Sequence, residues 1–298
     1  MDESKIINKS LMQSITEEIL LETKKNNDHT LLNSQLLTII KDFVVKQSYM
    51  ERKKNCTNPF NKYGRKCFSQ TDEDGITHEI IKRLGINKGT YAEFGVGDGM
   101  ENNTLLLASL GWKGFWVGGE DLVFDYPQND RFNYTKEWIT LENIIKVSKE
   151  NMKKMNIENL DVISLDLDGN DFHFCESILR NNLNPKLFII EYNSKFFPPI
   201  EFIMDYDQFH NWQLDDYYGA SLQSFNNLFN NYEYKLICCN SHTGTNAFFV
   251  KNEFSTLFKE VPDSIDKIFM EPNFDLACKF GHFSSNRVIS NIMNRVTF

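Results

Sequence analysis

Apolar residues recur at helical spacing in the first part of the chain. Between residues 4 and 23 they fall on every fourth position from Ile7 to Ile19, and residues 30–48 repeat the pattern from Leu32 onward. Such a stripe is typical of an amphipathic helix. The sequence therefore predicts two N-terminal helices, which pack on the core, on a second subunit or over the substrate.

A loop rich in Asn, Pro, Gly and basic residues follows at about Cys56–Phe68, and beyond it short apolar runs alternate with helical stretches. This alternation favours a mostly parallel sheet with crossover helices. The last two strands are too close together for a parallel connection, so they should form an antiparallel hairpin. We predict seven strands, at about Tyr91–Phe94, Gly114–Gly118, Trp138–Ile139, Asp161–Asp166, Lys186–Glu191, Tyr234–Cys239 and Asn246–Lys251. The predicted fold is α/β, a Rossmann-like seven-stranded sheet with an N-terminal helical extension.

The first of these strands runs into a glycine-rich loop, Glu93-Phe94-Gly95-Val96-Gly97-Asp98-Gly99. Glycines let the backbone turn sharply and let a ligand lie against it without interference from a Cβ atom. Met100 stands where the dinucleotide fingerprint requires a small residue, which counts against NAD. S-adenosylmethionine presents an ammonium group, and Glu93 offers a carboxylate to it. We predict cofactor contacts at Glu93, Gly95, Gly97, Asp98 and Gly99.

A second acidic residue is expected after the next strand, roughly 20 residues on, to accept hydrogen bonds from ribose hydroxyls. Glu120 and Asp121 stand there, and Glu120 is preferred. Asn103 and Asp166 complete the predicted cofactor contacts. The loop, the ribose acid and the hairpin together predict an S-adenosylmethionine-dependent methyltransferase of class I. Its core would span residues 56–255, between helical extensions at 1–55 and 256–298.

Acidic side chains gather after the fourth and fifth strands. Ligands of open α/β sheets bind beyond the carboxyl ends of the strands, so these groups should converge beside the cofactor. Clustered carboxylates repel one another unless a cation or a shared proton compensates. The set of oxygen donors Asp168, Glu191 and Asn193 suits Mg²⁺ or Ca²⁺ better than zinc, which makes a divalent cation a candidate cofactor.

Methyl transfer needs an acceptor oxygen that is close, aligned and deprotonated. Asp171 and His173 are the candidate bases, and Asp168 is a candidate catalytic residue through a metal that lowers the pKa of a hydroxyl. An alternative is that Asp171 caps the next helix and His173 is a packed residue. His210 is a secondary candidate base. Aromatic residues at 193–199 and 212–221 suit a sugar ring or simple packing.

Five stretches carry a family resemblance: Ser69–Gly75, Glu93–Thr104, Ser164–Asp171, Glu191–Asn193 and Thr245–Val250. Together they resemble a bacterial FkbM-like branch of class I methyltransferases, linked to modification of surface glycans and secondary metabolites. The resemblance implies O-methylation, commonly of a sugar hydroxyl, on a glycan or sugar-nucleotide acceptor. The chain is more loosely similar to metal-dependent sugar O-methyltransferases, which implies Asp168 as a metal ligand and Asp171 as the base.

The net charge of −9 and the pI near 5.3 argue against a general nucleic-acid binder. A local basic stretch at residues 51–66 is either a solvated loop face or a contact for an anionic substrate. The cysteines show no C-x-x-C spacing, and no apolar run approaches the roughly 20 residues that a membrane span needs. We therefore expect a cytoplasmic protein without a transmembrane segment, with the N-terminal helices as a homo-oligomer contact.

Two rival functions stay open. Asp166-Leu167-Asp168 matches the D-x-D of a metal-dependent glycosyltransferase, although such an enzyme has no need of the glycine loop. The other rival is a non-catalytic scaffold that keeps the cofactor fold.

Overall fold

The computed structural model describes residues 17–18, 30–126, 130–274 and 285–295. The chain divides into two compact units between Glu51 and Arg52. Helix α2 (Thr30–Asn55) has 26 residues and runs beyond the predicted stretch 30–48. The other predicted helix, at 4–23, lies outside the described residues except for residues 17 and 18, which are helical. Several apolar side chains of α2 are exposed, among them Leu37, Ile39, Phe43 and Met50, and a second subunit on this helix stays a prediction.

The second unit is built on a seven-stranded sheet with the order β3-β2-β1-β4-β5-β7-β6. Strands β3, β2, β1, β4 and β5 pair in parallel, and β7 lies antiparallel between β5 and β6. The strands are β1 (Thr90–Phe94), β2 (Lys113–Gly118), β3 (Phe132–Lys136), β4 (Val162–Leu165), β5 (Leu187–Glu191), β6 (Tyr234–Cys239) and β7 (Asn246–Lys251). The prediction of a Rossmann-like, mostly parallel sheet that ends in an antiparallel hairpin is confirmed.

The third strand does not lie where the sequence pattern put it, at Trp138–Ile139. Instead, β3 occupies Phe132–Lys136 and pairs with β2 along its length. The indole of Trp138 is 57% exposed, and its Nε1 donates to the carbonyl of Gln208 at 2.9 Å. The apolar pair Trp138–Ile139 therefore does not form a strand, and Trp138 instead contacts a loop that is distant in the sequence.

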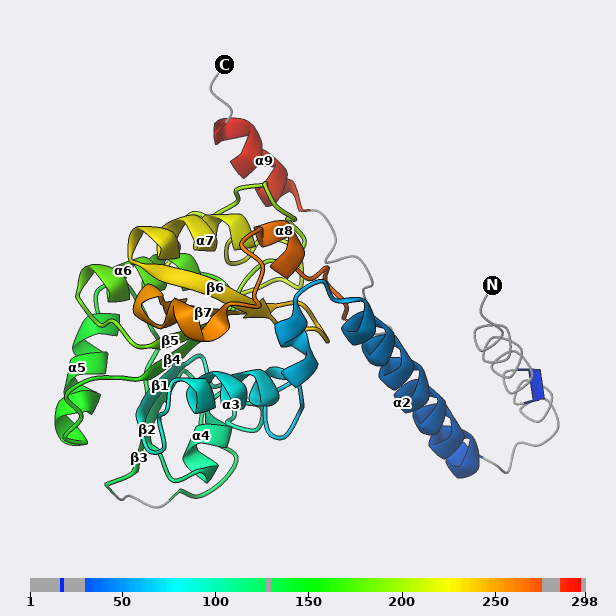
Figure 1. Cartoon of the computed structure of the whole chain (residues 1–298), viewed down its shortest axis with the longest axis horizontal. Helices are drawn as coiled ribbons and strands as arrows, with labels where there is room; N and C mark the ends of the chain where they lie inside the picture. Colours follow the sequence, from blue (N-terminus) through cyan, green and yellow to red (C-terminus); the bar gives the residue numbers. More distant parts are fainter. Residues whose placement is uncertain (1–16, 19–29, 127–129, 275–284, 296–298) are drawn as a thin grey trace. The chain divides into compact units, whose positions relative to one another are not determined.

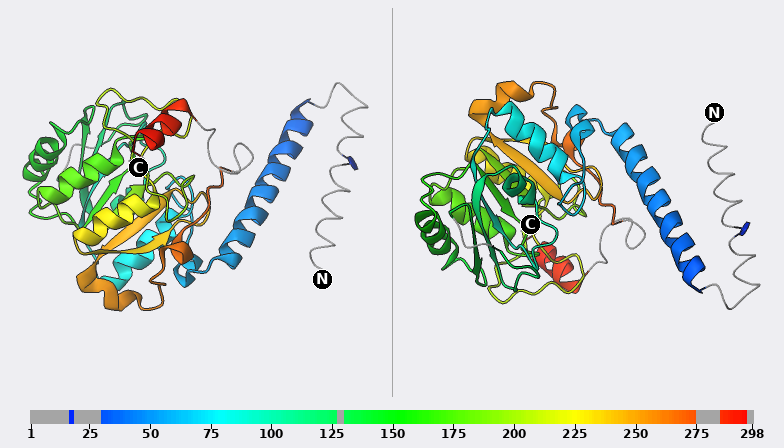
Figure 2. Two further views of the ribbon diagram at one scale, coloured as in Figure 1. Left: turned by 90° about the horizontal axis from the view of Figure 1, so that it is seen from above. Right: turned by 90° about the horizontal axis from the view of Figure 1, so that it is seen from below.

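Helices cover both faces of the sheet. Helices α3 (Glu73–Arg83) and α4 (Leu105–Ser109) lie on one face, and α5 (Ile144–Lys154), α6 (Asp171–Arg180) and α7 (Leu222–Asn231) lie on the other (Figures 1 and 2). Helix α7 illustrates why they form. Ser221 caps it by accepting from the amide of Ser224, and its buried residues recur at helical spacing from Leu222 to Phe229.

A long segment, residues 192–221, connects β5 to α7. Its ends are tied by a partly buried ion pair in which Lys195 Nζ lies 2.6 Å from Asp216 Oδ2. Asp216 Oδ1 also accepts from the amide of Ser285, just before α9 (Asn286–Arg295). Val288 of α9 belongs to a small buried cluster with Phe202 and Met204 of the segment. This segment carries side chains from beyond the sheet back to its carboxyl edge.

Shorter elements complete the described part of the second unit: η1 (Pro59–Tyr63), η2 (Asn252–Phe258) and α8 (Ile265–Ile268). Phe60 and Phe258 are fully buried, with ring centroids 5.7 Å apart, so η1 and η2 belong to the main core. Within the described ranges, no helix combines the length and apolar character that crossing a membrane requires.

Phe229 of α7 tests the packing of the helix on the sheet. Its ring is fully buried and stacks on Phe249 of β7 at a centroid distance of 4.2 Å. We expect Phe229→Ala to lower the free energy of unfolding by about 3–5 kcal/mol, because it removes apolar contacts and leaves a cavity. Urea denaturation checks this, with Phe209→Ala as the control because Phe209 is 80% exposed. Equal effects of both changes would contradict the packing described.

Candidate functional site

Two adjoining cavities lie at the carboxyl ends of the central strands, the edge where open α/β sheets bind ligands. The first has a volume of about 640 Å³ and the second about 330 Å³. The described residues that line both are Gly95, Gly97, Asp166, Asp168 and Trp212. The first cavity extends to the ends of β5 and β7, and the second extends to the end of β2.

The glycine loop follows β1 and lines both cavities. Gly95 has a φ of +87°, and a Cβ there would lie 1.7 Å from the carbonyl oxygen of Asp166, so only glycine lets the loop approach β4 this closely. Gly97 has a φ of +51°, and a Cβ there would meet nothing within 4 Å. Its backbone therefore faces open space in both cavities, which fits a ligand lying along the loop.

The side chain of Glu93 is deeply buried, and its hydrogen bonds are made within the protein. Its carboxylate accepts hydrogen bonds from the amides of Asn103 (2.8 Å) and Thr104 (3.0 Å) and from the Thr104 hydroxyl (2.5 Å). Thr104 Oγ1 in turn accepts from Trp116 Nε1 at 2.8 Å. Burial raises the pKa of Glu93, and these hydrogen bonds oppose that shift. Glu93 lines the first cavity, but its main role is to fix the loop and the start of α4.

The two acidic residues after β2 have different surroundings. Glu120 lines the second cavity beside Gly118 and Gly119, where a ribose acid was predicted. Asp121 forms an exposed ion pair with Lys136 at 2.7 Å and is not among the described residues that line either of these cavities. Of the two acidic residues, Glu120 is thus the one that lies at a described cavity beside the glycine loop, and its contact with a ribose stays a prediction.

Of the remaining predicted cofactor contacts in the loop, some line a cavity and one does not. Asp98 and Asn103 line the first cavity, and Asp98 Oδ1 accepts from the amide of Met100 at 3.0 Å. Gly99 lines neither of these cavities among the described residues. A Cβ on it would lie 2.8 Å from Leu122 and 2.9 Å from Phe124, so this glycine serves loop packing.

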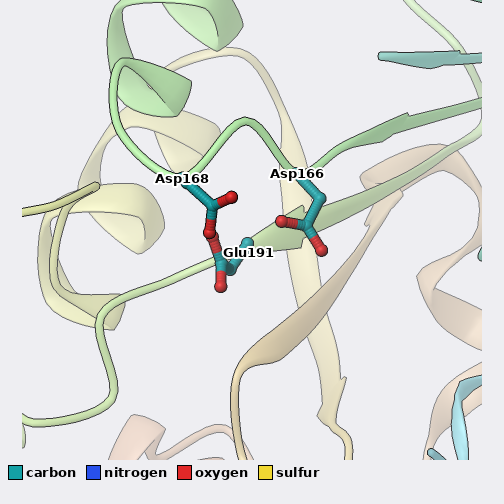
Figure 3. Close-up of side chains that lie close together, drawn as sticks. All are labelled: Asp166, Asp168 and Glu191. Carbon is teal, nitrogen blue, oxygen red and sulfur yellow. The ribbon is translucent and has the colours of Figure 1, made fainter. Parts of the chain in front are cut away.

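Three carboxylates meet where the cavities join. Asp166 and Asp168 follow β4, Glu191 ends β5, and one oxygen from each lies within 4.8 Å of the others (Figure 3). Desolvation raises the pKa of all three groups, and mutual repulsion adds to the shift for Asp166 and Glu191. The cluster thus needs shared protons or a cation, and its oxygen donors suit a divalent ion.

Asn193 does not present a free donor to this cluster. It is fully buried, and its Nδ2 donates to the carbonyls of Asp216 (2.9 Å) and Tyr218 (3.0 Å). Its Oδ1 accepts from the amide of Lys195 at 3.3 Å. Because these bonds hold the 192–221 segment, Asp166 replaces Asn193 as the third oxygen donor of the candidate metal set.

The predicted bases Asp171 and His173 are not among the described residues that line the two cavities. Asp171 is fully buried and accepts from the amides of Leu167 (2.9 Å) and Gly169 (3.1 Å), so it brackets the loop that carries Asp166 and Asp168. His173 Nε2 lies 2.9 Å from the carbonyl oxygen of Met204. Asp171 therefore holds the loop before α6 and does not cap that helix, whose N-cap residue is Asn170. A catalytic role for Asp171 or His173 stays a prediction.

His210 comes to the site from the 192–221 segment. It is 7% exposed, lines the second cavity, and its Nε2 has no hydrogen-bond partner. Burial lowers its pKa, and Arg287 adds to the shift. The ring packs against Gly169, where a Cβ would lie 2.4 Å from His210 Cδ2. Asn170 fixes this arrangement because it exchanges two hydrogen bonds with the backbone of Asp207, at 2.8 and 3.1 Å.

The sequence assigned no individual role to several lining residues of the first cavity: Gln70, Asn102, Thr245, Asn246 and Phe274. Most lie within the motifs that carried the family resemblance, which was the available signal. The basic stretch at 51–66 ties loops together instead of facing the cavities. Arg52 donates to the carbonyls of Ser241 (3.0 Å) and Glu271 (2.5 Å), and Lys53 to that of Gly64 (2.6 Å).

A comparison with protein-family models finds no match, and neither does a comparison with curated protein sequences. Among solved structures, a candidate hemolysin from Streptococcus thermophilus is similar with a TM-score of 0.40 at 9% identity, over 66% of this chain and 77% of that one. A methyltransferase of calicheamicin biosynthesis in its SAH-bound form gives 0.33 at 15% identity, over 75% and 59%. A glycopeptide N-methyltransferase complexed with S-adenosyl-L-homocysteine (SAH) gives 0.34 at 14%, over 64% and 94%. These likenesses are distant, so the fold rests on the strand order itself.

Asp171 should make stability depend on pH. Burial raises its pKa to about 6 from an ordinary value of 3.8, so the folded state binds this proton more tightly than the unfolded state. Its contribution to stability is complete below about pH 4 and is lost as the pH rises through about 6. Asp171→Asn should therefore reduce the decline in unfolding free energy over that range by up to about 3 kcal/mol.

Urea denaturation at closely spaced pH values checks this, and the exposed Asp42→Asn variant should keep the original profile. The Asp171→Asn protein should be less stable at low pH, because an amide nitrogen then faces a backbone N–H. An unchanged decline between pH 4 and 6 would show that Asp171 does not titrate there.

Proposed function

We propose that this protein is an S-adenosylmethionine-dependent O-methyltransferase of the FkbM-like branch, with residues 56–255 as its catalytic core. The acceptor is a sugar hydroxyl of a glycan or glycan precursor. The observation that carries the proposal is the glycine loop, whose Gly95 and Gly97 line two cavities that meet at Asp166 and Asp168. The cofactor and its acceptor have to bind in adjoining cavities for their reacting groups to come together.

The two cavities differ in ways that suggest which part of the cofactor each would hold. The second cavity offers Glu120 for ribose hydroxyls and the apolar Ile139 for a base. The first offers Asp98, Asn102 and Asn103 for the amino-acid end. When bound, the cofactor supplies a methyl group on a positively charged sulfur. The carboxylates Asp166 and Asp168 line both cavities and provide the negative surroundings that favour such a charge.

His210 is the proposed proton acceptor, in place of Asp171 and His173. Its buried Nε2 has no hydrogen-bond partner, and the ring lies against Gly169 beside Asp168, where the two cavities join. Its lowered pKa keeps the ring neutral, as a base must be. Trp212 and Tyr218 line the first cavity and offer the aromatic faces on which sugar rings pack. The protein's own part in the reaction is thus to align the acceptor and remove one proton.

A divalent cation at Asp166, Asp168 and Glu191 is a further proposal for the same site, and it would lower the pKa of an acceptor hydroxyl. It is supported by the three converging oxygen donors. Since their pKa values are raised, a cation has to displace protons when it binds.

Calorimetric titration with MgCl₂ or MnCl₂ tests the cation. We expect binding whose measured heat changes with the ionisation enthalpy of the buffer, and whose affinity rises as the pH is raised, because the pKa values of the three carboxyl groups are raised. Asp168→Asn should weaken it at least about tenfold, since the loss of an outer partner alone costs 10–100-fold. Asp121→Asn is the control. No binding at millimolar metal, or equal weakening by both changes, would argue for shared protons instead.

Binding of SAH by calorimetry tests the cofactor assignment. Glu120→Gln should raise the Kd for SAH roughly ten- to a hundredfold, because a charge-assisted hydrogen bond to a ribose hydroxyl contributes about 1.5–3 kcal/mol. The exposed Glu142→Gln, away from both cavities, should leave it unchanged.

Calorimetry and a cellular assay separate the two rival functions. A metal-dependent glycosyltransferase that used Asp166 and Asp168 would bind a sugar nucleotide with Mn²⁺ and would not bind SAH. A non-catalytic scaffold would show no loss of cellular function on His210→Ala while the variant stays folded. Either result would remove the methyltransferase proposal.

A further inference from the structure

Two polar residues face each other across the end of the sheet, at the wall of the first cavity. Glu191 is the last residue of β5, Asn246 is the first of β7, and they are direct partners in the antiparallel pairing. Side chains of directly opposed residues lie on the same face of a sheet, with Cβ atoms about 4.5–5.5 Å apart. Both residues line the first cavity, so their side chains form one pair at its wall.

Each member of this β5–β7 pair has a buried oxygen that accepts no hydrogen bond from the described residues, Oε2 of Glu191 and Oδ1 of Asn246. The Glu191 carboxyl group also shares a hydrogen bond with Asp166. Asn246 is 3% exposed, and its Nδ2 donates to Glu73 Oε1 at 3.2 Å, which fixes which end of the amide is the acceptor. Unsatisfied buried acceptors are costly and rare in proteins, so each calls for a partner. A ligand that donates hydrogen bonds would supply both.

A third unpartnered oxygen, Asn102 Oδ1, also lines this cavity and is 1% exposed. It belongs to the loop after β1, next to Asn103 and Glu93, where the amino-acid end of the cofactor is proposed to lie. Because the main role of Glu93 is internal, Asn102 is placed to accept from the cofactor ammonium. The β5–β7 pair therefore belongs to the acceptor side.

The charge of the lining gives the acceptor a second constraint. The described residues around the two cavities include carboxylates from every side and contain no Lys or Arg. Lys66 lies close by, but its Nζ donates to the carbonyl of Gln70 at 2.8 Å and lies 3.7 Å from Glu101. A phosphate or diphosphate in the first cavity would face these carboxylates without a compensating Lys or Arg among the described lining residues. A divalent cation bound by three ionised carboxylates would still leave that cluster without a net positive charge.

From these observations, and resting on the proposed function, we infer that the β5–β7 pair is the acceptor subsite. It takes hydroxyl or ammonium donors of an unphosphorylated sugar ring. The acceptor is then a neutral sugar or an amino sugar within a glycan, and sugar nucleotides are excluded. Glu191 and Asn246 determine this specificity by accepting the donors that hold the ring.

Saturation-transfer NMR on the full chain tests the inference with four probes: methyl glucoside, glucosamine, glucose 6-phosphate and uridine diphosphate glucose. The panel is measured with and without SAH, and with and without MgCl₂. We expect transfer to the first two probes and at least tenfold weaker transfer to the phosphorylated pair in every condition. Equal or stronger transfer to a phosphorylated probe in any condition, or no transfer to either unphosphorylated sugar, overturns the inference.

Variants assign the binding to the pair. Asn246→Leu should abolish transfer to methyl glucoside while the Kd for SAH changes less than about twofold. Asn227→Leu on the exposed surface of α7 is the control. Glu191→Gln, which keeps the size of the side chain, should lower the signal of glucosamine relative to methyl glucoside. If both variants bind the sugars as the unchanged protein does, the subsite lies elsewhere.

The same experiments test the proposed function independently of the acceptor subsite. A protein that binds the unphosphorylated sugars but not SAH would keep the subsite and lose the methyltransferase. A protein that binds SAH and prefers the phosphorylated sugars would keep the methyltransferase and lose the subsite.

Discussion

The buried carboxylate of Glu93 is the contact on which the site depends. It gathers two backbone amides and a hydroxyl at the start of α4, and the same hydroxyl holds the indole of Trp116 on β2. Strand β1, the glycine loop, α4 and β2 are thereby fixed relative to one another. Without this contact the backbone of Gly95 and Gly97 would have no defined position against β4, and the cavities that they line would lose their shared wall.

Buried carboxylates hold the rest of the site in the same manner. Asp72 accepts from the amides of Ser241 (3.2 Å) and His242 (3.1 Å), which fastens the β6–β7 turn. Asp74 Oδ2 accepts from three successive amides, those of residues 67, 68 and 69, at 2.7–2.9 Å. The acidic residues of the Ser69–Gly75 motif are thus structural, and they bring Gln70 and the start of β7 to the first cavity.

The sheet could be predicted from the sequence because strand ends, glycines and the short hairpin connection are local features. The roles of single side chains could not. Glu93 and Asp171 look like site residues because they stand at strand and helix ends, but a carboxylate there is also the best acceptor for unpaired backbone amides. His210 approaches Asp168 only because the irregular segment 192–221 returns to the carboxyl edge of the sheet. The pattern of apolar residues in the sequence does not predict the course of such a segment. The pairing of Glu191 with Asn246 likewise depends on strand order.

The two hydrogen bonds between Asn170 and the backbone of Asp207 have a thermodynamic consequence. They join the loop that carries the clustered acids to the segment that carries His210, so neither can move without the other. A molecule bound against one of them would also restrain the other, which would link the free energies of occupying the two cavities. Such linkage is reciprocal: whatever the first occupant does to the affinity for the second, the second does to the first by the same factor.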